Sequence, residues 1–303
     1  MKKSFSNPYD VIIIGGSYAG LSAAMALGRS LRKVLILDSG NPCNAQTPHS
    51  HNFITQDGKK PAEISGIALE QVLKYKTVEF IRQKAIEAKK TNSGFDIRTG
   101  SEEFSAKKII LATGIRDIFP DIRGLKECWG ISAIHCPYCH GYEFRDQKTG
   151  IMARGDKALH IAGLVKNLTD DLMVFTNGES EFSEEQLNKL SKNNIPVIED
   201  LVSEIIHHAG KLSGINLSDG KSFPVDALYT SLPFRQHSDI AGQLGCELTE
   251  TGHLRADNFQ KTNIYGVFAC GDNASSMRSV ANAVSAGNVA GAMANHQLVQ
   301  EVF

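Results

Sequence analysis

Apolar residues near the start of the chain follow the pattern of a parallel βαβ unit. The β-branched run Val11–Ile14 predicts a strand that is buried on both faces. The glycine-rich turn Gly15–Gly20 follows it, and residues Ala19–Leu31, rich in alanine and leucine, predict a helix. The apolar run Val34–Asp38 ends on an acid and predicts the second strand. This order of elements predicts a dinucleotide-binding fold.

The same pattern recurs in the middle of the chain. A second βαβ unit starts at Thr149, with a turn at Ala153–Ala158, a helix that continues through Ile161–Asn167 and a strand at Leu172–Phe175. Its turn has the spacing of GxGxxA with one glycine lost. The repetition predicts an α/β protein with two Rossmann-like, three-layer nucleotide-binding domains.

Further elements are predicted between and after the two units. They are a helix at Pro61–Tyr75, strands at Thr77–Ile81, Phe95–Thr99, Lys107–Gly114 and Gly266–Asp272, and an alanine-rich helix at Met277–Gln300. A long polar loop at Asn41–Gly58 carries His49 and His51.

The residues of the first turn fit a bound pyrophosphate. Gly15 suits the tight turn, and Gly20 allows the helix to pack closely on the strand. The N–H groups at the start of the helix can bind phosphate, and Asp38 can accept hydrogen bonds from a ribose. Ser17 replaces the middle glycine of GxGxxG.

Composition and charge exclude several classes of partner. The chain has 303 residues, 42% of them hydrophobic and 21% charged, with a formal net charge of −1. This balance favours neither nucleic acid nor an anionic membrane as a partner. Val11–Ile14 is too short for a signal peptide or a membrane span, so a cytoplasmic protein is expected.

The stretch His135–His140 carries Cys136 and Cys139 in a CxxC pair. A CxxC pair with flanking histidines is found in c-type haem attachment, in zinc binding and in dithiol–disulfide cycles. Haem attachment belongs to exported proteins, and a reducing compartment disfavours structural disulfides. The other cysteines are scattered, with no second CxxC, although His135 and His140 could add zinc ligands. Redox activity and metal binding therefore stay open at this point.

Four features together resemble the low-molecular-weight thioredoxin reductases over essentially the whole chain. They occur in the order GGSYAG, ATG at Ala112–Gly114, CPYC at Cys136–Cys139 and GVFACGD at Gly266–Asp272. The resemblance implies an FAD-binding domain built from residues 1–115 and 231–303. It implies an inserted NAD(P)-binding-like domain, residues 116–230, that carries the CxxC. It also implies a homodimer and no metal.

The resemblance implies roles for individual residues. Cys139 is expected to face the flavin and Cys136 to exchange with the substrate, while the last helix points its positive end at the flavin. Asp272 is expected near the ribityl chain or phosphates. The residues expected to bind FAD are Gly15, Ser17, Tyr18, Ala19, Gly20, Asp38, Ser39, Thr113, Gly114, Gly271, Asp272, Ser279, Val280 and Ala281.

One departure from the reductases lies beside the cysteines. His140 stands where those enzymes place an aspartate that moves protons. An imidazole titrates near neutrality and can do this work, so His140 is a third candidate catalytic residue. The motif CxxCHGYE also resembles dithiol oxidases of natural-product pathways, which pass electrons from small dithiols to oxygen.

A second departure affects the nicotinamide site. The reductases carry an arginine cluster for the NADPH 2′-phosphate, where this chain has Val174–Gly178 followed by an acidic loop. Ala153 replaces the first glycine of the turn, and Arg154 either compensates or is only solvated. FAD is thus expected, NAD(P)H use is doubtful, and NADH, another reductant or oxygen become alternatives. Arginines placed at Thr176 and Asn177 are expected to raise NADPH use.

Three functions follow from these features. The first is a thiol–disulfide oxidoreductase acting on a thioredoxin-like protein or a small dithiol or disulfide. The second is a dithiol oxidase, and the third is a flavin redox sensor without turnover. His49 or His51 is a candidate base towards a substrate thiol, and Arg278 a candidate helix-surface cation.

Overall fold

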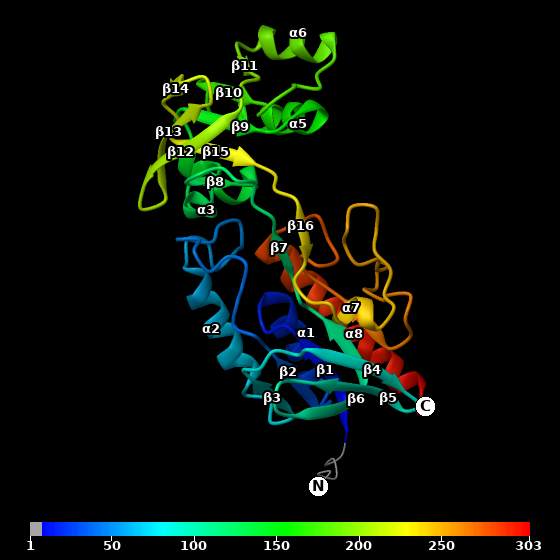
Figure 1. Ribbon diagram of the computed structural model, residues 1–303. Coiled ribbons are helices and arrows are strands. Elements are labelled where there is room, and N and C mark those ends of the chain that lie inside the picture. The colour runs from blue at the N-terminus through cyan, green and yellow to red at the C-terminus, as the bar shows by residue number, and fades with distance from the viewer. Residues whose placement is uncertain (1–7) are drawn as a thin grey trace. The chain divides into compact units, whose positions relative to one another are not determined.

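The computed structural model describes residues 8–303, and the basic start of the chain lies outside the described residues. The chain forms two compact units (Figure 1). The described part of the first unit comprises residues 8–45, 61–116 and 234–303, and the second comprises residues 46–60 and 117–233. The loop 46–60 therefore groups with the second unit. The chain passes between the units at the paired strands β7 (Ile115–Asp117) and β16 (Phe234–Gln236).

The first unit is built on a seven-stranded sheet of order β3-β2-β1-β6-β5-β4, in which β17 also pairs with β6. Its parallel strands are β1 (Tyr9–Ile14), β2 (Val34–Leu37), β3 (Val78–Ile81), β6 (Glu103–Leu111) and β17 (Val267–Ala269). The strands β4 (Glu87–Thr91) and β5 (Gly94–Arg98) run antiparallel. One edge of β6 pairs with β5 over its first half and with β17 over its second half, so this strand holds the sheet together.

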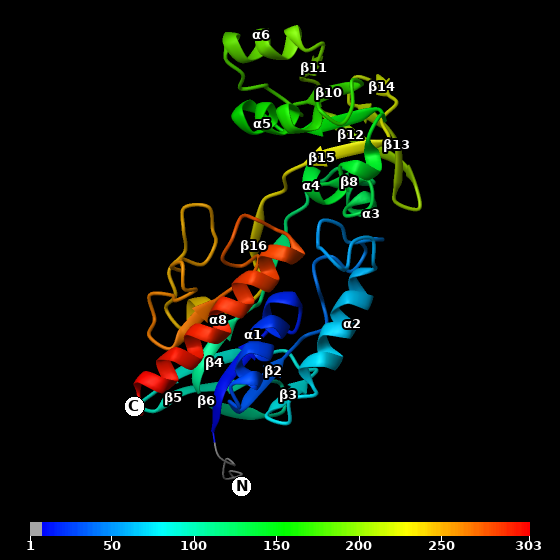
Figure 2. The same ribbon diagram turned by 180° about the vertical axis from the view of Figure 1, so that it is seen from behind.

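The two faces of this sheet have different covers. Ile12 and Ile14 of β1 pack with side chains of β4, β5 and the short helix α7 (Ile240–Gln243). The alternate residues Val11 and Ile13 are fully buried on the opposite face. The helix α1 (Tyr18–Arg29) covers that face beside the long helix α8 (Val280–Gln300), as Figure 2 shows. A third helix, α2 (Pro61–Val72), packs against α1.

Glycines allow α1 and α8 to touch along their backbones. A Cβ atom added at Gly287 would lie 2.1 Å from the carbonyl oxygen of Ala19, and one at Gly291 would lie 2.5 Å from that of Ala23. No side chain fits at either position without moving the backbone of α1. The contact fixes the start of α8 against the start of α1.

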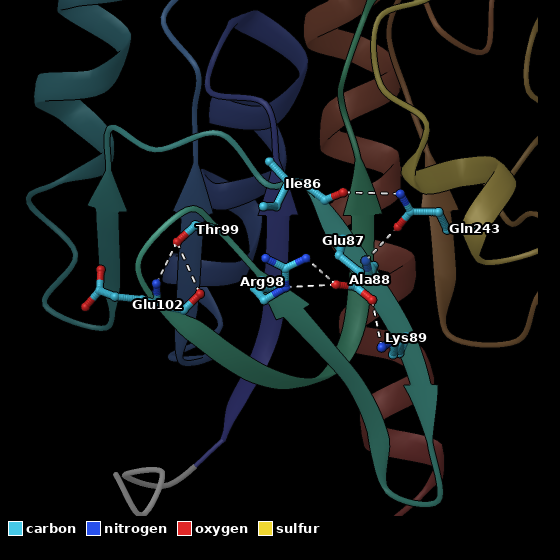
Figure 3. Close-up of polar contacts among 8 residues, drawn as sticks. All are labelled: Ile86, Glu87, Ala88, Lys89, Arg98, Thr99, Glu102 and Gln243. Atoms are coloured by element: carbon cyan, nitrogen blue, oxygen red, sulfur yellow. Dashed lines mark hydrogen bonds and ion pairs between the residues drawn. The ribbon is translucent and has the colours of Figure 1, made fainter. Parts of the chain in front are cut away.

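The β4–β5 hairpin at the edge of the sheet is closed by polar side chains (Figure 3). Gln243 of α7 accepts a hydrogen bond from the N–H of Ala88 at 2.9 Å and donates one to the carbonyl of Ile86 at 3.2 Å. Arg98 pairs with Glu87 across the hairpin at 2.6 Å. Gln243 thus occupies one backbone N–H of the edge strand β4 and the carbonyl of the residue before that strand.

The second unit repeats the α/β pattern with a parallel sheet of order β11-β10-β9-β15-β8. These strands are β8 (Ala133–Ile134), β9 (Thr149–Met152), β10 (Leu172–Phe175), β11 (Val197–Ile198) and β15 (Ala227–Thr230). An antiparallel sheet contains β12 (Val202–His208), β13 (Lys211–Leu217) and β14 (Ser222–Phe223). The helices are α3 (Leu125–Cys128), α4 (Pro137–His140), the 3-10 turn η1 (Tyr142–Phe144), α5 (Gly155–Val165) and α6 (Glu184–Lys192).

This unit has three layers, because alternate side chains of its parallel strands pack on opposite faces of the sheet. Ile151 of β9 and Tyr229 of β15 pack with α5 and α6. Their neighbours Met152 and Leu228 pack instead with β12 and β13. The parallel sheet therefore lies between helices on one face and a second sheet on the other.

The predicted α/β fold class with two Rossmann-like parts is confirmed. Four helix ends were wrong by a few residues, and two of them are the ends of α2 at Val72 instead of Tyr75 and of α5 at Val165 instead of Asn167. The last helix begins at Val280 and not at Met277, because Ser279 caps it by accepting a hydrogen bond from the N–H of Asn282 at 3.1 Å. The first helix ends at Arg29, before Leu31, which has a φ of 56°.

Candidate functional site

The glycine turn of the first unit has no room for side chains. Gly15 has a φ of 113°, and a Cβ on it would lie 2.1 Å from the carbonyl oxygen of Ala112. A Cβ on Gly20 would lie 1.8 Å from the carbonyl oxygen of Gly15. Both contacts are with backbone atoms, which cannot give way. The turn therefore brings the N-terminus of α1 close to the end of β1, the arrangement that binds a pyrophosphate.

Asp38 at the end of β2 lies against this turn. Its carboxylate accepts a hydrogen bond from the N–H of Gly16 at 3.1 Å and pairs with Arg82 at 2.7 Å. Arg82 follows β3, whose end lies next to the end of β2 in the parallel sheet. Arg82 was not predicted from the sequence, although its position directly after a buried strand was a usable signal.

The predicted residues Thr113, Gly114 and Gly271 lie together at the carboxyl ends of β6 and β17. The side-chain amide of Asn273, fully buried, donates to the carbonyl of Leu111 at 2.8 Å and to the hydroxyl of Thr113 at 3.2 Å. This amide ties the loop after β17 to the end of β6. Asn273 was also missed, because only the fold brings its side chain to a strand 160 residues away.

The loop between β17 and α8 carries charged groups. Asp272 pairs with Arg278, with 3.7 Å between carboxylate oxygen and guanidinium nitrogen, and both side chains are largely buried. The thiol of Cys43 lies 3.8 Å from the same carboxylate oxygen. Arg278 is thus a partner of Asp272, and its interpretation as a helix-surface cation was wrong.

The remaining predicted cofactor residues differ in what their side chains do. The hydroxyl of Tyr18 donates to the carbonyl of Pro61 at 3.1 Å and accepts from Asn44 at 3.2 Å, so it fixes the start of α2. Ser17 is the N-cap of α1 and makes no side-chain hydrogen bond to that helix. The other four are Ala19 in the first turn of α1, Ser39 after β2, and Val280 and Ala281 in the first turn of α8.

These features fit a dinucleotide. The glycine turn, Asp38, Thr113, Gly114, Gly271 and the starts of α1 and α8 all belong to the first unit. They lie at the carboxyl ends of parallel strands, where such sheets bind nucleotides.

The corresponding turn of the second unit is closed by its own loop. The N–H of Gly155, at the start of α5, donates to the carbonyl of Ser180 at 3.0 Å. The guanidinium of Arg154 donates to the carbonyl of Thr176 at 2.7 Å and to that of Asn177, and lies 3.6 Å from Glu181. Arg154 therefore binds the loop after β10 and is neither merely solvated nor free for a phosphate.

The contacts of this loop argue against the expectation that arginines at Thr176 and Asn177 raise NADPH use. Thr176 is almost fully buried, and Asn177 accepts a hydrogen bond from the N–H of Val202 at 2.8 Å. Arginine at either position removes contacts that shape the loop, so these positions do not suit that experiment.

The CxxC pair spans the short helix α4. Cys136 is its N-cap, Pro137 starts it without needing an N–H partner, and both cysteines are half-buried free thiols. A hydrogen bond from Cys139 lowers the pKa of Cys136 to about 7, and the backbone N–H groups of Cys139 and Tyr138 add to this against the opposing effect of burial. Cys136 is therefore the more readily ionised and nucleophilic thiol at neutral pH.

His140 follows the pair and has two titratable neighbours. Burial lowers the pKa of His140, the imidazole of His51 lowers it further, and Glu143 opposes both effects. The rings of His51 and His140 meet edge to face, with 6.5 Å between centroids. His140 is thus a neutral imidazole at pH 7, able to accept a proton.

A buried tyrosine hydroxyl interacts electrostatically with Cys136 and Glu143. Tyr229 on β15 is 1% exposed, and its hydroxyl has no hydrogen-bond partner among the residues that the structure describes. Its Cα pairs with that of Ile134, two residues before Cys136. Burial raises the pKa of Tyr229, and the charges of Cys136 and Glu143 raise it further.

Residues 8–303 lack two features that other classes of function would need. They contain no group of three His, Cys, Asp or Glu side chains placed to hold a metal ion. They also contain no helix that is long and apolar enough to span a membrane.

Comparison with known proteins identifies similar chains. The sequence profile of the family described as pyridine nucleotide-disulphide oxidoreductase matches residues 9–287. The thioredoxin reductase tcpT of Claviceps purpurea is 34% identical, over 99% of this chain and 97% of its own. The thioredoxin reductase sirT of Leptosphaeria maculans is 31% identical, over 95% and 94%. A crystal structure of an oxidoreductase from Agrobacterium tumefaciens has a TM-score of 0.91 and 38% identity, over 97% of this chain and 99% of its own.

Proposed function

Because the chain belongs to the pyridine nucleotide-disulphide oxidoreductase family, and is an oxidoreductase of the thioredoxin reductase type, we propose that FAD and the Cys136–Cys139 pair carry its reaction. We assign FAD to the first unit, where the glycine turn, Asp38 and the loop at Gly271–Asp272 would hold it. A bound FAD supplies two-electron exchange with a dithiol and can pass electrons to oxygen.

We propose further that the electrons come from a small dithiol and not from NADPH. The observation that supports this direction is the closed turn of the second unit, in which Gly155 donates to Ser180 and Arg154 to the loop carbonyls. The pyrophosphate of NADPH would need these N–H groups, and its 2′-phosphate would need an arginine. The carboxylate of Glu181 would also repel a phosphate there.

The cysteines perform the exchange in two steps. A substrate thiolate attacks the sulfur of Cys136 in the enzyme disulfide and forms a mixed disulfide, and Cys139 leaves as a thiolate. The second substrate thiolate then attacks the mixed disulfide, forms the substrate disulfide and releases Cys136. The pKa of Cys136, about 7, makes it a good leaving group in this second step.

His140 has the protonation state that this exchange requires. Each attacking thiol must lose a proton, and each leaving cysteine can take one up. A neutral imidazole beside the pair can accept the first proton and return it in the second transfer.

A second candidate is the reduction of a thioredoxin-like protein. It is favoured by the names of the full-length relatives from Claviceps purpurea and Leptosphaeria maculans. It uses the same cysteines in the opposite direction. The homodimer implied by the resemblance and the cytoplasmic location expected from the short apolar run at Val11–Ile14 belong to the proposal. Sedimentation and cell fractionation test them.

The experiment that tests the proposal is the substitution Cys139→Ser. The variant should keep FAD bound, because Cys139 belongs to the second unit, but its flavin should no longer be reduced by a small dithiol. Cys246→Ser serves as the matched control, because Cys246 lies in the first unit after α7 and its thiol contacts the hydroxyl of Thr262 at 4.0 Å. Dithiol reduction of the flavin that survives in Cys139→Ser contradicts the assignment of the pair.

A further inference from the structure

The loop 46–60 is closed on itself and packs within the second unit. The backbones of Ser50 and Lys59 pair at 2.8 Å, and Asp57 accepts from the N–H of Asn52 at 2.7 Å. The side chain of Gln46 donates to the carbonyl of Trp129. The last of these contacts holds the loop against the segment that leads to the cysteines, although 83 residues separate Gln46 from Trp129 in sequence.

The two histidines of this loop have different surroundings. His51 is half-buried, with one ring nitrogen 3.5 Å from Glu143 and the other 3.6 Å from Asp57. Its ring also meets His140, the residue after Cys139. His49 is exposed, and its Nδ1 lies 2.9 Å from the carbonyl of Gly58 within the loop. Only His51 therefore contacts groups beside the CxxC pair.

We propose that His51 and Glu143 are positioning residues that set the charge and orientation of His140 during thiol–disulfide exchange. This inference rests on the proposed function, in which His140 takes the proton of the attacking thiol and returns it to a leaving cysteine. No atom is gained or lost, because the dithiol gives two protons and two electrons to the enzyme disulfide and becomes a disulfide itself.

The arrangement has a physical reason. His140 must be neutral before the exchange and must tolerate a positive charge after it accepts a proton. Burial and the neighbouring imidazole of His51 favour the neutral form, and the carboxylate of Glu143 stabilises the charged form. The carboxylate of Asp57 faces the other nitrogen of His51 and holds its ring in place.

Substitutions of His51 and of Glu143 are expected to shift the pKa of His140 in opposite directions. In His51→Asn the imidazole that lowers the pKa of His140 is lost, so the pKa of His140 should rise. In Glu143→Gln the stabilising carboxylate is lost, so the pKa of His140 should fall. Histidine resonances of isotope-labelled, FAD-loaded enzyme followed over pH measure both shifts. His208→Asn is the matched control, because His208 is an exposed histidine at the end of β12 in the same unit, and it should leave the pKa of His140 unchanged.

Kinetics give the second measurement. Rapid mixing of the oxidised enzyme with dithiothreitol at several pH values measures the exchange. His51→Asn should slow the exchange about tenfold at neutral pH and displace its pH profile upward, whereas His208→Asn should match the wild-type enzyme. If the His140 resonance and the pH profile are the same in His51→Asn as in His208→Asn, the inference is overturned. Failure of the wild-type enzyme to exchange with any dithiol overturns the proposed function instead, and the resonance shifts still decide whether His51 and Glu143 act on His140.

Discussion

Cys136 differs from an ordinary thiol because two residues of the same short turn, Cys139 and Tyr138, supply its hydrogen bonds. Its pKa is lowered to about 7 from the usual value near 9, first by Cys139 and then by two backbone N–H groups. Because the thiolate is the reactive form, the pKa decides how fast this cysteine reacts at a given pH.

The alkylation rate of reduced Cys136 should therefore rise through pH 7 and level off above it. In Cys139→Ala the largest favourable contact is lost, so the midpoint should move upward towards that of a free thiol. Mass spectrometry of iodoacetamide-treated protein over a pH series measures both midpoints. An unchanged midpoint in Cys139→Ala would show that the other contacts are sufficient.

At this scale the sequence identified residues that belong to short motifs. Cys136, Cys139 and His140 are adjacent in the chain, so their chemistry was predictable from spacing. Glu143 belongs to the same motif but gained a role only when the fold brought His51 to it. Arg82 and Asn273 were missed because their partners lie far away in sequence. Tyr229 was missed because only the pairing of β15 with β8 places it near Cys136.

Among the elements, the α1–α8 contact gives a test of packing. Gly287→Ala places a methyl group against the backbone of α1, and should lower the free energy of unfolding of the first unit by about 2 kcal/mol. Gly66→Ala is the matched control, because a Cβ at this exposed position of α2 meets nothing within 4 Å. It should raise the free energy of unfolding by about 0.5 kcal/mol. Thermal unfolding of the two variants measures the difference, and equal midpoints would contradict the close contact.

The loop after β10 gives a second test. Arg154→Ala removes the guanidinium that binds the carbonyls of Thr176 and Asn177, at a cost of about 1–2 kcal/mol given its partial exposure. The N–H of Gly155 should then exchange with deuterium faster, because its acceptor at Ser180 belongs to the loosened loop.

Lys157→Ala is the control for that experiment, because Lys157 is an exposed cation three residues after Arg154, in the first turn of α5. Equal exchange rates in the two variants would show that Arg154 does not hold the loop closed.

Element patterns were predictable where strands are buried on both faces. The runs at Val11–Ile14 and Leu172–Phe175 are continuous apolar segments, and both form parallel strands. The antiparallel strands β12 and β13 were not predicted. Each has only one buried face, and register irregularities interrupt their pairing, so their apolar residues alternate imperfectly.

In the whole molecule, the βαβ architecture occurs twice, and the two turns differ in how accessible they are to a nucleotide. In the first unit Gly15 and Gly20 leave no room for side chains in the turn, and the carboxylate of Asp38 is paired with Arg82. In the second unit the turn is covered by its own loop, and Glu181 of that loop lies 3.6 Å from Arg154. The sequence showed the lost glycine at Ala153, but only the fold showed how Arg154 is used.

The central claim is that dithiols reduce the flavin through Cys136 and Cys139, whereas nicotinamide cofactors do not. An anaerobic titration of the purified yellow protein with NADPH, NADH and then dithiothreitol, followed by flavin absorbance, tests it most directly. We expect the flavin to keep its colour with both nicotinamides, to bleach with dithiothreitol and to recover on admission of air. Rapid bleaching by stoichiometric NADPH would contradict the account and restore a nicotinamide-dependent reductase.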